Sequence, residues 1–303
     1  MTWDTESLWQ KAKLYTVRAH GEDRNGDLYP LWSTLALEFL ARAALAHVHP
    51  ALLADHRHPE NIMYAFGYSG TGKSVPAETV FRRCQKVIPN FTEAEARQCM
   101  ALIDRRNEEL HTGAPSFSQF PTRLWLADYY RNCKLLCDFL GKELADLLGV
   151  EEAKGAQLMI DSLQERVSEL VREAMRDAAR FYEGLDPDRR KTRGDDIEHE
   201  LRTRFILTRK TVPCPACGCI AFLTGEVVGE GPPKPSEEDL VQEVVVLPTH
   251  LECLGCELKL NTHAEVHAAG FGGQYTVEEH YDPVDFFNIQ IDELHEYGDY
   301  LNE

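Results

Sequence analysis

Apolar positions recur with helical spacing through most of the first 185 residues. Residues 31 to 47, LWSTLALEFLARAALAH, follow this spacing, and their two charged interruptions, Glu38 and Arg42, are four positions apart and share a face. The segment from residue 75 to 89 also has helical spacing, with Pro76 near its start. The pattern predicts a core helix at 31–47 that carries a charged pair, followed by a second helix.

A further helix is bounded by sequence signals at both ends. Thr92 followed by Glu95 fits a capping box, the periodic segment runs from residue 93 to 111, and Gly113 marks its end. The segment RRNEELH, residues 105 to 111, therefore forms the last two turns of this helix. We expect one more apolar-faced helix at 125–149.

The pattern of apolar and polar residues changes after the helical part of the sequence. A charged helix is predicted at 151–185, and LDPDRRKTRG, residues 185 to 194, has the composition of a polar linker. Beyond Thr211 short β-rich runs alternate with a Pro-rich loop. The sequence thus predicts a mainly α protein with a small β-rich C-terminal domain, organised as a helical domain (1–150), a helical extension (151–185), a basic linker (186–210), the β-rich domain (211–276) and an acidic tail (277–303).

Charge is distributed unevenly along the 303 residues. Residues 1–145 hold 17 basic and 17 acidic side chains, whereas residues 146–303 hold 15 and 33, so the net charge of −18 comes from the second half. The overall field repels nucleic acid, which would have to bind local basic patches. No apolar run approaches the roughly 18 residues that cross a bilayer, and the polar N-terminus does not fit a signal peptide, so we expect a cytoplasmic protein.

Two pairs of cysteines stand out from the nine in the chain. Cys214 with Cys217 and Cys253 with Cys256 form two C-x2-C pairs, and each pair can present two thiolates to one ion. The pattern resembles a zinc ribbon with a lengthened central loop. We expect a structural Zn²⁺ ion there, because four thiolates leave no open position for catalysis. Four reduced thiols in a β core are the alternative, and nearby Cys219, His250 or His263 could replace one ligand.

A glycine-rich motif offers a nucleotide-binding alternative. GYSGTGKS, residues 67 to 74, fits the P-loop pattern G-x4-G-K-[ST], in which Lys73 and Ser74 would hold a triphosphate and Mg²⁺. A P-loop needs a preceding strand and a parallel sheet, yet the surrounding sequence is helical. Pro76 is also awkward inside the first turns of a P-loop helix. The segment fits better as a glycine-rich loop before an ordinary helix, with Ser74 near its N-cap and Pro76 near its first position.

The helix end at RRNEELH carries the strongest catalytic pattern. Arg106, Asn107 and His111 spell R-N-x-x-x-H, which resembles the Arg-x4-6-His signature of the HEPN superfamily, helical-bundle proteins of which many are metal-independent ribonucleases. The resemblance covers about the first 145 residues: an early helix with an acid, Glu38, a later helix ending in the motif, and a closing helix from Trp125. The second half of the chain lies outside it.

The resemblance implies a particular chemistry. Asn107 and His111 share a helix face, whereas Arg106 is about 140° around the helix from His111, so the two need a long Arg reach or a partner chain. HEPN proteins generally pair so that two such helices line one cleft. There His111 would act as general acid or base on RNA and Arg106 would neutralise phosphate charge, leaving 2′,3′-cyclic phosphate ends. Asn107 would orient His111 or the phosphate, and Glu38 would position Arg106 or His111.

The same residues also have ordinary structural interpretations. A His at a helix C-terminus is a common capping cation, and Arg among Glu is usually a solvated face. Basic residues that could receive RNA equally fit a solubilising surface; they are Arg82, Arg83, Lys86, Arg189, Arg190, Lys191, Arg193, Arg202, Arg204, Arg209 and Lys210.

The hypothesis that follows is a homodimeric, metal-independent endoribonuclease, with a role as a toxin or phage-defence effector suggested by the resemblance alone. One alternative is a non-catalytic dimer whose zinc ribbon binds nucleic acid or a regulatory protein partner. The other is a P-loop NTPase.

Overall fold

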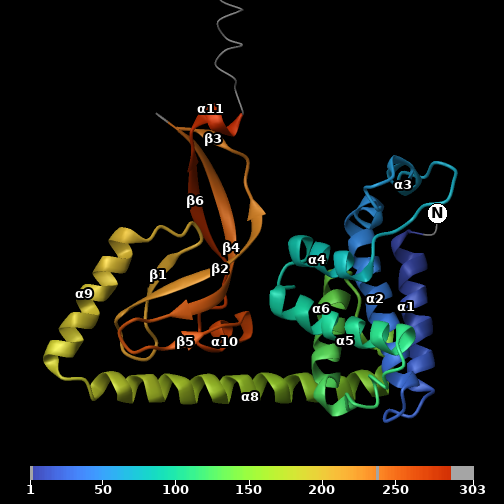
Figure 1. Ribbon diagram of the computed structural model, residues 1–303, viewed down its shortest axis with the longest axis horizontal. Helices are drawn as coiled ribbons and strands as arrows, with labels where there is room; N and C mark the ends of the chain where they lie inside the picture. Colours follow the sequence, from blue (N-terminus) through green and yellow to red (C-terminus); the bar gives the residue numbers. More distant parts are fainter. Residues whose placement is uncertain (1–2, 237–238, 288–303) are drawn as a thin grey trace, which may run out of the picture. The chain divides into compact units, whose positions relative to one another are not determined.

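The computed structural model describes residues 3–236 and 239–287, and the chain divides into two compact units, Met1–Val167 and Ser168–Glu303 (Figure 1). The division lies within a long helix, whereas the sequence predicted a domain boundary at residue 150. The first unit is helical, and the second contains an antiparallel sheet. The predicted fold class, mainly α with a small β-rich C-terminal part, is confirmed at this level.

The first unit is built from helices joined by short loops. Its α-helices are α1 (Thr5–His20), α2 (Leu28–Val48), α3 (Pro59–Ala65), α4 (Ala77–Val87), α5 (Glu93–His111), α6 (Leu126–Phe139), α7 (Leu144–Leu148) and the first half of α8 (Val150–Glu183), with single 3₁₀ turns η1 (Pro50–Leu53) and η2 (Thr122–Leu124).

Helix α2 is the centre of this unit. It contacts α1, α4, α5 and α6 (Figure 1). Its alanine and leucine side chains from Ala36 to Ala46 are buried. The neighbouring helices add large buried side chains, among them Phe81, Ile103 and Tyr130. Burial over most of its surface explains why α2 is mainly apolar and lacks the polar face of a surface helix, apart from the buried pair Glu38 and Arg42. The core helix predicted at 31–47 is confirmed.

The ends of α5 and α6 follow from local sequence. The capping box of α5 is present, with Thr92 and Glu95 bonded reciprocally. The single helix predicted at 125–149 is wrong, because the chain breaks into α6 and α7. Gly141 adopts a φ of 66°, and the amide of Lys142 donates to the carbonyl of Cys137 at 2.9 Å, which closes α6 with a glycine C-terminal motif.

The linker predicted at 186–210 is also wrong over most of its length. Residues Pro187–Thr203 form helix α9, which Asp186 caps by accepting from the amide of Arg189 at 2.8 Å. Asp at the N-cap followed by Pro in the first turn is a signal for the start of a helix. The prediction gave more weight to the basic, polar composition of the segment and so missed this signal. The charged helix before it is confirmed as α8.

The second unit contains a sheet around one long strand. The strands are β1 (Lys210–Pro213), β2 (Ile220–Glu230), β3 (Lys234–Pro235), β4 (Leu240–Glu252), β5 (Lys259–Leu260) and β6 (Tyr275–Tyr281), with helices α10 (His263–Ala268) and α11 (Pro283–Phe286). All pairings are antiparallel. Strand β4 pairs with β2 and β3 along one edge and with β5 and β6 along the other, so it is the central strand (Figure 1).

Strand β2 bends where a glycine lies against β4. The register shifts between Thr224 and Gly225, and a Cβ atom on Gly225 would lie 1.9 Å from the carbonyl oxygen of Leu247. Only glycine allows this approach of the two backbones.

The acidic tail predicted at 277–303 begins too early. Residues Val277–Tyr281 belong to β6, where they pair with Leu240–Val244 of β4. Residues 288–303 of the predicted tail lie outside the described residues. In the described part of the chain, no helix combines the length and the apolar character that crossing a membrane requires.

The four cysteines of the first unit are core residues. Cys84, Cys99, Cys133 and Cys137 are buried, and burial raises the pKa of each thiol above its ordinary value. They serve as small apolar side chains, as the sequence predicted.

Candidate functional site

Arg106 and Glu38 meet at the contact between α5 and α2. The Nη1 atom of Arg106 donates to Oε2 of Glu38 at 2.6 Å, and the neighbouring Asn107 accepts through Oδ1 from Nε at 3.2 Å and from Nη2 at 3.0 Å. All three nitrogens of the guanidinium therefore have an acceptor. Three of the four residues predicted to be catalytic, Glu38, Arg106 and Asn107, therefore lie together, although Glu38 and Arg106 are 68 positions apart in the sequence.

A second arginine shares the same carboxylate. Arg42 donates to Oε1 of Glu38 through Nη2 at 2.7 Å and Nε at 3.0 Å. Arg42 also donates to the hydroxyl of Ser74 at 3.1 Å and the carbonyl of Val75 at 3.0 Å. The helical spacing pairs Glu38 with Arg42, and the family resemblance alone suggested that Glu38 positions Arg106; the joining of both arginines by one carboxylate depends on the tertiary fold.

Burial makes this bridge energetically important. The side chains of Arg42, Glu38 and Arg106 are 10%, 11% and 14% exposed. Ions removed from water to this extent interact strongly, and losing one partner leaves the other charge uncompensated. The carboxylate thus fixes the Arg106 guanidinium in one position.

A pocket of about 530 Å³ opens beside this cluster. Helices α2, α4 and α5 and the loop before α4 contribute its walls. The charged lining comprises four cations, Arg42, Arg57, Lys73 and Arg106, and three carboxylates, Glu38, Glu78 and Asp104; the lining also includes Ser74, Val75, Pro76, Ala77, Met100, Ile103 and Asn107. Arg57 was not singled out in the sequence, since nothing in its local pattern marks it.

His111 lies apart from this pocket in the single chain. It is the last residue of α5 and is exposed, and it does not line the pocket. Within residues 3–236 and 239–287, no hydrogen bond or ion pair of its side chain is found. The fold of one chain therefore assembles Glu38, Arg106 and Asn107 but leaves His111 free to face another molecule.

The glycine-rich motif is a packed loop between two helices. Helix α3 precedes it and α4 follows, so a helix ending at Ala65 stands where a P-loop requires a strand. The amide of Lys73 donates to Oδ1 of Asn61 at 2.8 Å, and the carbonyl of Lys73 accepts from the amide of Asp55 at 3.1 Å. The amide of Val75 donates to the carbonyl of Leu53 at 2.9 Å.

Glycine is needed in this loop for packing. A Cβ atom on Gly72 would lie 2.4 Å from Cδ1 of Tyr64 and 2.8 Å from Cη2 of Trp3. A P-loop instead directs its backbone amides, including that of the lysine, toward phosphate. The amide of Lys73 is occupied within the fold, and only the side chains of Lys73 and Ser74 reach the pocket.

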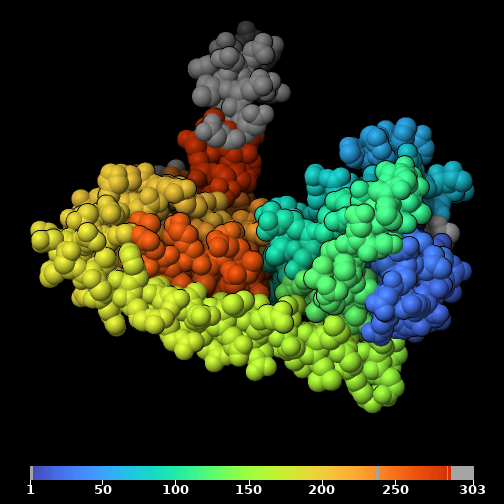
Figure 2. Space-filling view, turned by 60° about the horizontal axis from the view of Figure 1, so that its bottom comes forward, coloured from blue at the N-terminus to red at the C-terminus, as the bar shows by residue number. Residues whose placement is uncertain are grey.

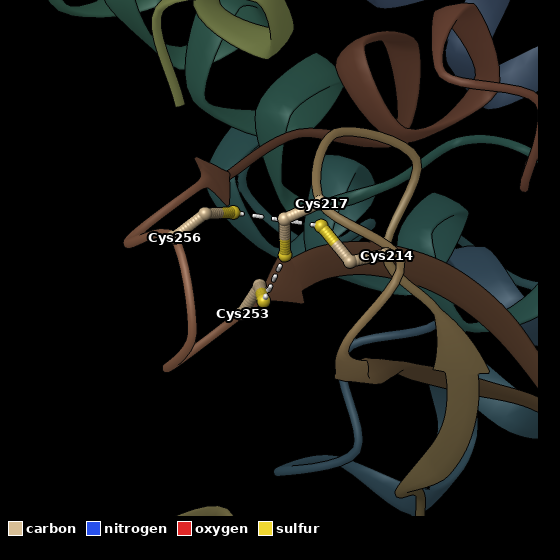
Figure 3. A group of neighbouring side chains, drawn as sticks. All are labelled: Cys214, Cys217, Cys253 and Cys256. Atoms are coloured by element: carbon tan, nitrogen blue, oxygen red, sulfur yellow. Dashed lines mark hydrogen bonds between the residues drawn. The ribbon is translucent and has the colours of Figure 1, made fainter. Parts of the chain in front are cut away.

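The cysteine pairs of the second unit converge on one point. Cys214 and Cys217 lie between β1 and β2, and Cys253 and Cys256 lie in the turn after β4 (Figure 3). Their four sulfur atoms are all within 4.8 Å of one another. The contacts Cys214–Cys256 and Cys217–Cys253 are both 3.6 Å. The four side chains are thus close enough to bind a metal ion.

The spacing of the sulfur atoms suits a tetrahedral ion. Four thiolates bound at about 2.3 Å to a central zinc ion would lie about 3.8 Å apart. A hydrogen bond from Cys253 lowers the pKa of Cys214 to about 5, which favours its thiolate form. Burial raises the pKa of Cys217 and Cys256, and the same hydrogen bond raises that of Cys253.

The nearby residues that could have replaced a ligand have other contacts. His263 bonds through Nδ1 to the carbonyl of Pro248 at 2.8 Å, and His250 bonds to the Thr249 hydroxyl at 2.8 Å. Cys219 bonds to the hydroxyl of Tyr182, which raises the pKa of that phenol. The four paired cysteines are the group that forms the cluster in the described chain.

Helix α9 packs against the second cysteine turn. Arg193 donates to the carbonyl of Leu254 at 3.0 Å and forms an ion pair with Glu257. In Figure 2 the yellow region that contains α9 lies beside an orange part of the second unit. Other basic residues predicted to receive RNA are paired with acids, as Arg204 and Arg209 are with Glu200. The surface formed by α9 and the segment after it is consequently less basic than the sequence suggested.

No protein-family model, curated protein or solved structure matches the chain.

Proposed function

We propose that the protein is a metal-independent endoribonuclease that acts as a homodimer. The single observation that supports this most is the Arg106 guanidinium, held by Glu38 and Asn107 at the edge of a cationic pocket, one and a half turns before His111 on the same helix. An arginine fixed in this way stabilises charge that develops on a phosphate, and it does so without reorganisation during the reaction.

The chemistry assigned to this site is transesterification at an RNA phosphate. The 2′-hydroxyl oxygen attacks phosphorus, its proton passes to an imidazole, and the bond from phosphorus to the 5′-oxygen breaks. A second imidazole donates a proton to the departing 5′-oxygen. The products are a 2′,3′-cyclic phosphate end and a 5′-hydroxyl end.

Pairing of two chains would supply both imidazoles. His111 is exposed and has no side-chain partner in the described chain, and Arg106 points to the α2–α5 contact. Within one helix the two side chains diverge by about 140°. A homodimer in which the C-terminal ends of two α5 helices face each other brings both imidazoles and both guanidiniums to one cleft.

The four cysteines of the second unit hold a structural Zn²⁺ ion in this proposal. Zinc prefers a closed set of thiolate ligands in structural sites, and the two cysteine turns would be joined by it. Because all four positions are taken by protein sulfur, the ion orders the second unit and takes no part in RNA cleavage.

The experiment that tests the ribonuclease compares purified wild-type protein with His111→Ala and Arg106→Lys on labelled tRNA and mRNA in EDTA. We expect cleavage by the wild type and a rate at least about a hundredfold lower for His111→Ala, the range for loss of a general acid or base. His263→Ala is the matched control, since that imidazole is in the other unit. An inactive wild type would favour the non-catalytic dimer.

A further inference from the structure

The pocket beside Arg106 has features that cleavage alone does not require. Its lining includes Lys73, the lysine of the glycine-rich motif, although the loop is not a P-loop. We propose, resting on the ribonuclease function above, that this pocket is a subsite for the RNA phosphate next to the scissile one, with Lys73 as its principal ligand.

Lys73 is the cation of the pocket that forms no salt bridge with the described residues, whereas Arg106 keeps one N–H on each of Nη1 and Nη2 for the scissile phosphate. The guanidinium of Arg42 is used by Glu38, Ser74 and Val75, and that of Arg106 by Glu38 and Asn107. By contrast, the exposed ammonium of Lys73 forms no salt bridge in the part of the chain that the structure describes. Its charge acts on Asp55 only over a longer distance, so it can bind a phosphate without breaking a salt bridge.

The remaining charges of the lining are largely compensated. Arg57 forms a salt bridge with Asp55 at 2.5 Å, and this pairing lowers the pKa of the Asp55 carboxyl. Glu78 pairs with Arg82 at 2.5 Å, and Glu38 is shared by two arginines. Asp104 is the exception, and it disfavours a highly charged triphosphate more than a single phosphodiester.

The first turn of α4 adds hydrogen-bond donors to the same wall. Pro76 is the N-cap, and it offers no side chain to cap the amides that follow. Pro76, Ala77 and Glu78 all line the pocket. Uncapped amides at the N-terminus of an 11-residue helix add partial positive charge to the side on which Lys73 lies.

The volume and the apolar wall favour a nucleotide unit over a free ion. At about 530 Å³, the pocket is far larger than one phosphate group, and Met100 and Ile103 of α5 give it an apolar side. A sugar and base would lie against these side chains while the phosphate reaches Lys73. Arg106 lies at the same pocket, so the scissile phosphate and its neighbour would be bound along one strand.

The test measures RNA binding on a background that cannot cut. His111→Ala and the double variant His111→Ala with Lys73→Ala are titrated against a fluorescein-labelled 12-nucleotide single-stranded RNA, and anisotropy is read at several salt concentrations. We expect about tenfold weaker binding for the double variant, as for loss of one charge-assisted contact. The slope of log Kd against log salt should also fall by about 0.7, the value for one phosphate contact on a single strand.

Two variants separate the subsite from a general charge effect. Lys73→Arg should retain most of the affinity, whereas Lys154→Ala removes an equal charge from the exposed surface of α8 and should leave both affinity and slope unchanged. Because the Lys73 side chain is exposed, its removal should leave the thermal unfolding midpoint unaltered, and this is verified by circular dichroism.

The outcomes distinguish the two proposals. If wild-type protein cuts RNA but Lys73→Ala changes neither the affinity nor the salt slope, the subsite is refuted and the ribonuclease stands. If wild-type protein cuts nothing, the ribonuclease falls, and the subsite falls with it unless Lys73→Ala still weakens RNA binding while Lys154→Ala does not.

Discussion

Arg106 donates to Glu38 at 2.6 Å across the contact between α5 and α2. This ion pair ties the helix that ends in His111 to the central helix of the first unit. Because the same carboxylate also accepts from Arg42, it is the shared counter-ion of two partly buried guanidiniums, and the three side chains carry a net charge of one positive unit. Glu38 is consequently as much a structural residue as a candidate positioning residue.

Removing the charge of Glu38 should therefore destabilise the first unit. We expect Glu38→Gln to lower the free energy of unfolding by about 3 kcal/mol, because two guanidiniums lose their counter-ion. Urea denaturation followed by circular dichroism measures this. Glu108→Gln is the matched control. That carboxylate is on the surface of α5, and its ion pair with Arg105 is long, at 3.7 Å, and exposed, so it contributes little to stability. Equal stability of the two variants would show that the bridge contributes nothing.

The glycine-rich loop should tolerate no side chain at position 72. Gly72→Ala places a methyl group against Tyr64 and Trp3 at distances that force them to move, so we expect a loss of about 2 kcal/mol. Gly113→Ala has open space around the new methyl group, so its free energy of unfolding should lie within about 0.5 kcal/mol of the wild-type value. A Gly72→Ala protein as stable as wild type would contradict the packing described for this loop.

Metal content should separate the clustered cysteines from their neighbour. Elemental analysis of purified wild type is expected to give one zinc per chain, and Cys217→Ser should lose most of it, because three thiolates bind zinc far less tightly than four. Cys219→Ser should retain the metal, since Cys219 is two residues away but outside the cluster. Retention by Cys217→Ser together with loss from Cys219→Ser would reassign the ligand.

The N-cap of α1 should make a pH-dependent contribution to stability. The backbone amide and the hydroxyl of Ser7 donate to Asp4 at 2.8 and 2.7 Å, and these bonds lower the pKa of Asp4 below 3.8. When the pKa of a carboxyl is lower in the folded state than in the unfolded state, the ionised group stabilises the fold at any pH above the unfolded-state pKa. This stabilisation is lost as the pH falls through the folded-state pKa.

The variant Asp4→Ala should cost about 1 kcal/mol near neutral pH, the usual value of an N-cap. Urea denaturation at several pH values should show the difference from wild type narrowing as the pH falls below about 4. Asp4→Asn, which keeps an acceptor but does not titrate, is the control: it should be less destabilised than Asp4→Ala by a constant amount, because the pH dependence of both differences comes from the wild-type carboxylate. A constant difference for Asp4→Ala would contradict the role of the carboxylate.

Local signals in the sequence predicted local structure well. The Thr92 capping box, the apolar helix at 31–47 and the two cysteine pairs each carry a pattern with a short physical range, and each is found as expected. The break at Gly141 and the start of α9 at Asp186 also had local signals, which composition and apolar periodicity outweighed.

The tertiary part of the site could not be read from spacing. Nothing near Arg106 indicates that it lies against Glu38, or that the loop of Lys73 opens into the same pocket. These contacts depend on how α2, α4 and α5 pack. At the glycine-rich motif the sequence already favoured a loop before an ordinary helix over a P-loop, and the hydrogen bond from the Lys73 amide to Oδ1 of Asn61 supports that interpretation.

The chemistry of the RNA ends tests the central proposal most directly. Wild-type protein in EDTA is incubated with one labelled RNA oligonucleotide and with the same sequence carrying 2′-deoxyribose at every position, and the 3′ ends are identified by mass spectrometry. The proposal predicts that only the ribose strand is cut, with 2′,3′-cyclic phosphate ends that are absent with His111→Ala. Cleavage of the deoxy strand, or equal cleavage by His111→Ala, would contradict it.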